Sequence, residues 1–250
     1  MTYLQNPPRN RTVIPFVIIF IACIFFIVNS FTADTDYAVF VSGAIVALAF
    51  AVTTYGFVLY ERYSHIRKLG ISYLFLGLAF LSYGISETIY IHNDWFGIET
   101  YPNLMIDVPV ILYYMFAILH IVYTIRHYSL SHSTHTLALF SIVSMTVVFV
   151  GFSLTSDTES FDFVYSLPFV LMSGLLVGMA LYTTYSVRSN IVALPWLLIG
   201  LAIMAASGAD VYYYIIENLD LYVYGDIVDT FYFGTDIMML LGLWMLKRRI

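Results

Sequence analysis

Long apolar stretches, separated by short segments rich in Asn, Asp, Gly, Pro and Ser, follow one another along the whole chain. An α-helix rises 1.5 Å per residue, so about 20 apolar residues cross the roughly 30 Å hydrocarbon core of a bilayer. The pattern therefore predicts an all-α integral membrane protein with eight transmembrane helices. They comprise residues 13–31, 37–60, 70–92, 104–126, 135–154, 162–187, 191–216 and 224–246.

The composition supports this class. Hydrophobic residues make up 61% of the 250 residues and charged residues 10%, and the mean hydropathy is +0.86. A soluble domain carries about 25% charged residues, so the lipid bilayer is the expected surrounding of this chain. The net charge of −6 includes no basic stripe, and we expect no nucleic-acid partner. Cys23 is the only cysteine, which excludes disulfides within the chain.

The basic residues indicate the orientation in the membrane. With eight spans, all ten Lys and Arg residues fall on one side, which the positive-inside rule makes cytoplasmic. A count of seven spans would put some of them on the other side. We therefore predict a multi-pass protein of the cell membrane with both termini in the cytoplasm and acidic loops outside. The basic residues are Arg9, Arg11, Arg62, Arg67, Lys68, Arg126, Arg188, Lys247, Arg248 and Arg249.

Two internal similarities have the same offset of 123 residues. The acidic pattern T-x-D-T-[DE] occurs at 32–36 and 155–159, and the segment Gly77–Tyr90 aligns without gaps with Gly200–Tyr213. The sequence therefore predicts a duplicated four-helix unit, with a pseudo-twofold axis along the membrane normal. The predicted division is a cytoplasmic segment 1–12, a first repeat 13–126, a connector 127–134, a second repeat 135–246 and a basic end 247–250.

The alignment matches Glu87 with Asp210 and Tyr90 with Tyr213, and each tyrosine follows its acid by three residues, on the same helix face. Carboxylates and aromatic rings together attract organic cations through charge pairing and cation–π contact. We therefore predict an outward-facing pocket for a small cation or amine. Its predicted residues are Glu87, Tyr90, Asp107, Asp210, Tyr213, Asp226 and Asp229.

Structural roles remain open for these residues. Asp107 and Asp226 begin the outer ends of two predicted helices, where an acid interacts favourably with the helix dipole. The chain has 22 tyrosines, and rings near the membrane surface commonly form an interfacial belt. Simple hydrogen bonding between helices is the alternative to ligand binding.

Asp236 is predicted to lie roughly 15 Å inside the membrane, about ten residues beyond Asp226 on the same helix face. No basic residue is predicted at that depth, so its carboxyl group needs a proton, hydroxyl donors or a bound cation. His120, inside the predicted helix 104–126, is a possible partner for it. We predict a proton or cation site at Asp236 and His120, and a neutral, hydrogen-bonding Asp236 is the alternative.

The order of acids and tyrosines also carries a resemblance. In each predicted half, an [ED]-x2-Y helix is followed by a helix that opens on Asp, with Tyr six residues later. This arrangement resembles the multi-helix membrane sensory regions of bacterial and archaeal signalling proteins, which implies ligand sensing. The chain ends at LKRRI without a kinase or cyclase domain, so we expect it to act through a membrane or cytoplasmic protein partner.

Three other functions compete with a sensor-like module. A small solute or proton-coupled transporter would use Asp236, and a non-catalytic subunit of a membrane complex needs no site of its own. An intramembrane hydrolase is the least favoured, because G-x-S-x-G, H-E-x-x-H, Walker and Rossmann motifs are absent from the sequence. We therefore predict no catalytic residues, no metal site and no cofactor.

Overall fold

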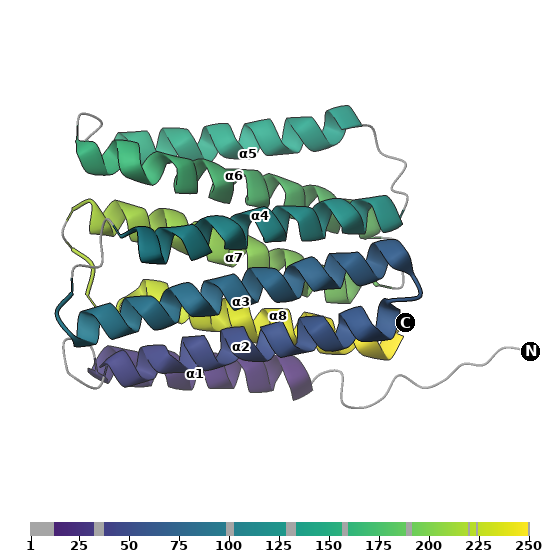
Figure 1. Ribbon diagram of the computed structural model, residues 1–250, viewed down its shortest axis with the longest axis horizontal. Helices are drawn as coiled ribbons and strands as arrows, with labels where there is room; N and C mark the ends of the chain where they lie inside the picture. Colours follow the sequence, from purple (N-terminus) through teal and green to yellow (C-terminus); the bar gives the residue numbers. More distant parts are fainter. Residues whose placement is uncertain are drawn as a thin grey trace, which may run out of the picture.

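The chain folds into a bundle of eight α-helices that run along one long axis (Figure 1). The computed structural model describes residues 13–32, 38–98, 103–128, 134–156, 160–188, 192–219, 221–223 and 225–249. The helices are α1 (Val13–Thr32), α2 (Ala38–Tyr63), α3 (Arg67–Trp95), α4 (Leu104–His127), α5 (Thr134–Thr155), α6 (Phe161–Val187), α7 (Ala193–Glu217) and α8 (Ile227–Arg249).

All eight predicted helices are present, and the predicted class of all-α membrane protein is confirmed. Seven helices, α2 to α8, are long and apolar enough to cross a membrane, and the described part of α1 adds the shorter apolar helix Cys23–Thr32. Most helices extend slightly beyond the apolar stretches at one end or both; α3, for example, begins at Arg67 rather than at residue 70, whereas α2, α7 and α8 begin one to three residues later than predicted. Hydropathy marks only the segment suited to lipid, whereas backbone hydrogen bonding continues into the flanking polar residues.

Parts of the sequence pattern lie outside the described residues. They are Arg9, Arg11, the core of the first acidic segment at 33–36, and residues 157–159 of the second.

Six of the helices form a closed ring. Going around it, α2 packs against α3, α3 against α4, α4 against α6, α6 against α7, α7 against α8, and α8 against α2. The other two helices lie outside the ring, α1 mainly against α8 and α5 mainly against α6 (Figure 1). The first three and last three ring helices therefore meet at two seams, α2–α8 and α4–α6.

Small residues allow the closest helix contacts. A Cβ added at Gly56 of α2 would lie 2.9 Å from the Cα of Gly77 on α3. On the other side of the bundle, a Cβ at Gly178 of α6 would lie 2.6 Å from the Cα of Ser141 on α5. Association of helices in lipid depends on such close backbone approach, because there is no difference in hydrophobicity to drive it.

Large side chains fill the interior of the ring at the end where α2 joins α3 and α6 leads into α7. Trp196, Tyr73 and Leu243 are at most 1% exposed there. The indole of Trp196 stacks on His120 with ring centroids 5.8 Å apart, and Tyr73 packs against the same imidazole at 6.1 Å. Ser72 contributes hydrogen bonds to His120. This filled end leaves the opposite end as the place for a ligand site.

Candidate functional site

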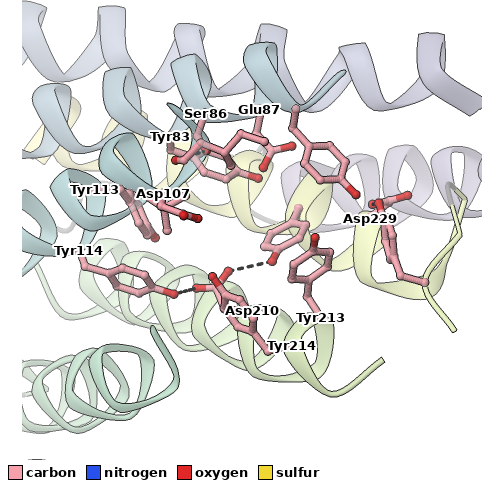
Figure 2. A pocket seen from close by; sticks show the side chains of 15 residues that line it. Tyr83, Ser86, Glu87, Asp107, Tyr113, Tyr114, Asp210, Tyr213, Tyr214 and Asp229 are labelled. Atoms are coloured by element: carbon pink, nitrogen blue, oxygen red, sulfur yellow. Dashed lines mark hydrogen bonds between the residues drawn. The ribbon is translucent and has the colours of Figure 1, made fainter. Parts of the chain in front are cut away.

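A cavity of about 90 Å³ opens inside the ring at the end where α3 leads into α4 and α7 into α8. Figure 2 shows side chains from these four helices converging on it. Four carboxylates, eight tyrosines and three other residues line it. The lining comprises Glu87, Asp107, Asp210 and Asp229; Tyr83, Tyr90, Tyr113, Tyr114, Tyr213, Tyr214, Tyr222 and Tyr232; and Ser86, Ile106 and Val110.

The tyrosines form two connected groups. In the first, Tyr83 packs against Tyr113 and Tyr232 with ring centroids 5.6 and 6.1 Å apart, and Tyr113 packs against Tyr114 at 5.3 Å. In the second group, around Tyr213, the rings meet nearly edge to face. Such contacts fix the rings in place, so the aromatic faces available to a ligand are held by their neighbours.

The second group centres on Tyr213. Its ring lies 5.1 Å from Tyr222 and 5.4 Å from Tyr214, at interplanar angles of 76° and 72°. Tyr90 packs against Tyr222 at 6.4 Å. Tyr90 and Tyr213, which are equivalent in the predicted repeat, therefore meet in one aromatic cluster.

Asp210 is the most heavily hydrogen-bonded of the four carboxylates. Tyr114 donates to its Oδ2 at 2.6 Å, and Tyr232 donates to its Oδ1 at 2.8 Å. Ser173 lies 2.8 Å from the Tyr114 hydroxyl and extends this network into α6. The donors come from α4 and α8, so Asp210 on α7 connects three ring helices. Hydrogen bonds of this kind, to an ionisable group, are stronger than those between neutral groups.

Asp229 and Asp107 are also held by the protein. The carboxylate of Asp229, only 4% exposed, accepts from the backbone N–H of Gly225 at 2.9 Å and from the Tyr222 hydroxyl at 3.2 Å. Gly225 has φ of +94°, a left-handed conformation that glycine adopts without strain. Asp107, in the first turn of α4, accepts a hydrogen bond from the Tyr165 hydroxyl.

Glu87 differs from the other three. It enters the cavity from α3, opposite Asp210 on α7 (Figure 2). Its carboxylate has no hydrogen-bond donor within the part of the chain that the structure describes. A carboxylate at this depth is costly unless water or a ligand compensates it. Glu87 is therefore the acid that remains available to a bound cation.

Asp226 has a different position. It does not line the cavity; its Oδ1 accepts from the backbone N–H of Val228 at 3.1 Å, at the start of α8. Its backbone carbonyl accepts from the Nδ2 of Asn29 at 3.2 Å, which joins α8 to α1. This geometry is the helix-capping alternative expected for an acid at this position.

No basic side chain lines the cavity. Among the described residues, no group of three or more His, Cys, Asp and Glu side chains is arranged to hold a metal ion. The site thus combines negative charge with aromatic faces and offers no anion-binding group. Its chemistry suits a positively charged organic molecule.

Six of the seven predicted pocket residues line this cavity, all except Asp226. The sequence reasoning missed Tyr83 and assigned most of the other lining tyrosines to an interfacial belt. A signal for Tyr83 was present, because it precedes Glu87 by four residues and therefore lies on the same face of α3. The convergence of rings from four helices is a tertiary property, and no spacing along the chain reveals it.

The suggested pairing of His120 with Asp236 is wrong. His120 is fully buried at the filled end, where its Nδ1 lies 2.8 Å from the Ser72 hydroxyl and 2.9 Å from the Ser72 carbonyl. Its Nε2 and the Oδ2 of Asp236 are both without a hydrogen-bond partner, so the two side chains do not meet. A neutral serine, rather than a carboxylate, is the hydrogen-bond partner of the Nδ1 of this buried imidazole.

Comparison with protein-family models finds none that matches the chain, and comparisons with curated proteins and with solved structures find no match either. Function must therefore be argued from the chemistry of the cavity.

Proposed function

We propose that the chain is a sensor-like membrane module that binds a compact organic ammonium ion in the tyrosine-lined cavity and acts through a protein partner. One observation carries the proposal: a cavity lined by eight tyrosines and four carboxylates, with no basic side chain among its described lining residues, includes one carboxylate, that of Glu87, to which none of the described residues donates a hydrogen bond. An ammonium group would pair with Glu87, and the tyrosine faces would contact its alkyl substituents.

The size of the cavity limits the ligand. About 90 Å³ accommodates a few water molecules or a small ammonium ion, since one water occupies roughly 30 Å³ in the liquid. A small primary amine or a methylated ammonium fits this space better than a nucleotide or a peptide does. The hydrogen bonds that hold Asp210 and Asp229 keep the cavity walls in place before binding, which reduces the ordering cost of association.

We also infer that the cavity faces the outside of the cell. The basic residues of the described chain lie at helix ends remote from the cavity, which supports a cytoplasmic assignment for those ends. They are Arg62, Arg67, Lys68, Arg126, Arg188, Lys247, Arg248 and Arg249.

An internal duplication is part of the proposal. The ring order supports it, because exchanging α2, α3 and α4 with α6, α7 and α8 converts the α2–α8 seam into the α6–α4 seam. The exchange also relates Glu87 to Asp210, two acids that enter one cavity. The outer helices depart from this symmetry, since α1 packs against α8 whereas α5 packs against α6. We propose that the repeats diverged at their first helices.

Ligand binding is tested by thermal unfolding of the purified protein with tetramethylammonium, methylammonium, ethanolamine and choline, against CsCl at equal ionic strength. We expect at least one organic cation to raise Tm in a saturable way, because a ligand that binds only the folded state stabilises it. Glu87→Gln should weaken that ligand by about ten-fold or more, equivalent to about 1.4 kcal/mol.

Glu61→Gln is the matched control, because Glu61 is exposed near the end of α2 that is remote from the cavity. This variant should bind as wild type does. Equal affinity in wild type and Glu87→Gln, or the absence of any response to the whole panel, would contradict the proposal.

Transport is the second candidate, favoured by a smaller cavity that continues from the first toward Asp236 in the middle of α8. A carrier would move the same ammonium ion across proteoliposome membranes, whereas a sensor would bind it without flux. Uptake of a radiolabelled cation that raises Tm distinguishes the two functions.

A further inference from the structure

A second cavity, of about 10 Å³, lies deeper in the ring than the tyrosine-lined one. It shares Tyr83, Tyr113, Asp210 and Tyr232 with the larger cavity, and four further residues complete its lining. These are Phe80, Ala206, Thr235 and Asp236. A volume of this size accommodates one water molecule or one small ion.

Two polar groups at this cavity are unsatisfied. Asp236 is 1% exposed, and its Oδ2 has no hydrogen-bond partner. The hydroxyl of Tyr83, also buried, has none either. Leaving a buried polar group unpaired is unfavourable, and leaving a buried charged group unpaired is more so. Both groups border the same small space, so one bound species can satisfy both.

The nature of that species follows from charge. Asp236 lies about 10 Å further along α8 than Asp229, by the helical rise, and the cavity has no basic side chain. A water molecule can satisfy hydrogen bonds, but only a cation also compensates the charge of an ionised Asp236 in the interior of the bundle. The oxygen atoms of Asp236, Tyr83 and Thr235 are hard donors, which suit an alkali cation better than a soft metal.

We propose that this cavity binds one small monovalent cation, of the size of Na⁺, between Asp236 and the Tyr83 hydroxyl. Asp236 provides the charge, and the remaining oxygens replace part of the hydration shell of the ion. The absence of a group of three acidic or histidine side chains among the described residues argues against a divalent metal. Asp210, already bonded by Tyr114 and Tyr232, contributes negative potential from the side of the larger cavity.

The site is tested on the purified full chain by thermal unfolding in NaCl and in CsCl, with the total salt held constant. Wild type should gain about 3 °C or more in Tm at saturating NaCl, because the ion binds the folded state. Asp236→Asn should lose this difference between the salts. Asp229→Asn, a matched change on the same helix, and Glu87→Gln should both keep it, which separates this site from ammonium binding.

Equilibrium binding of radioactive sodium provides an independent measurement. We expect one ion per wild-type chain, displaced by unlabelled NaCl and not by CsCl, and no specific binding to Asp236→Asn. If Asp236→Asn does not fold, Tyr83→Phe replaces it and should weaken sodium binding several-fold. Equal stability in the two salts together with no bound sodium in wild type would overturn the proposal, as would unchanged binding in Asp236→Asn or, if that variant does not fold, in Tyr83→Phe.

Discussion

The two ends of the six-helix ring contain similar kinds of residues, but one end is tightly packed and the other encloses a cavity. Both contain tyrosines and a buried ionisable group. At the filled end, Trp196 and Tyr73 cover His120, and Ser72 bonds to its Nδ1. At the cavity end, tyrosines surround four carboxylates, and together they enclose a cavity of about 90 Å³.

The difference shows how one helical bundle can combine a packed end with an end that retains a cavity. A wide indole and an imidazole can close the interior, because together they carry only three ring nitrogens, and Ser72 satisfies the Nδ1 of His120. Carboxylates cannot close it in the same way, because each needs several donors. Asp210 obtains them from Tyr114 and Tyr232, whereas none of the described residues donates to Glu87. Glu87 is thus the carboxylate at which we propose that a cation binds.

The strongest test of the filled end is Trp196→Ala. Trp196 is 1% exposed, and removal of a fully buried indole should cost about 3–5 kcal/mol of the free energy of unfolding. Unfolding in SDS mixed micelles measures this change. Trp95→Ala is the control, because Trp95 is 54% exposed and should cost far less. Similar losses in the two variants would contradict the assignment of the filled end as the stability core.

At the cavity end, the largest stability effect should come from the donors to Asp210. Tyr114→Phe and Tyr232→Phe each remove one hydroxyl and leave a carboxylate oxygen short of a donor, at a cost of about 1–3 kcal/mol. The loss of unfolding free energy in the double variant should differ from the sum of the two single losses, because both hydrogen bonds end on one carboxylate. Tyr212→Phe, a change at a 39% exposed ring, should leave unfolding unchanged.

A smaller effect is expected for Ser72→Ala. Its hydroxyl lies 2.8 Å from His120 Nδ1 and 2.7 Å from the Thr124 hydroxyl, and the loss of these contacts should cost about 1 kcal/mol. The same unfolding assay measures it, with exposed Ser64→Ala as reference. Ligand affinity should not change, since Ser72 belongs to the filled end. A change in affinity would show that the two ends are coupled.

Glu87→Gln should have the smallest effect on stability, within about 0.5 kcal/mol, because it removes no hydrogen bond from any of the described residues. Its effect should instead be on ligand affinity. Asp210→Asn is the informative partner: it replaces an acceptor of two tyrosine hydroxyls and should destabilise the bundle. If Glu87→Gln destabilises the protein as much as Asp210→Asn does, the two acids do not differ in their hydrogen bonding to the protein.

Hydropathy predicted the helices well because lipid imposes a length and a composition on each span separately. The pocket residues Glu87, Tyr90, Asp210 and Tyr213 were also predictable, since each acid and its tyrosine share a helix face. The role of Asp226 could not be separated from that of Asp229 by position alone, because capping depends on the local turn. His120 and Asp236 were thought to pair because both lie deep in the membrane, yet depth does not specify which side of the ring a residue occupies.

The hydrogen bond from Tyr114 to Asp210 has a mechanical consequence. It joins α4, in the first set of three ring helices, to α7, in the second, and it crosses the interior rather than either seam. Together with the stacking of His120 on Trp196 and the contact of Tyr83 with Tyr232, it links the two sets of helices across the interior, away from the α2–α8 and α4–α6 seams. An occupant of the cavity that drew the Tyr114 hydroxyl away from Asp210 would break this hydrogen bond. The relative tilt of the two sets of helices would then depend on occupancy.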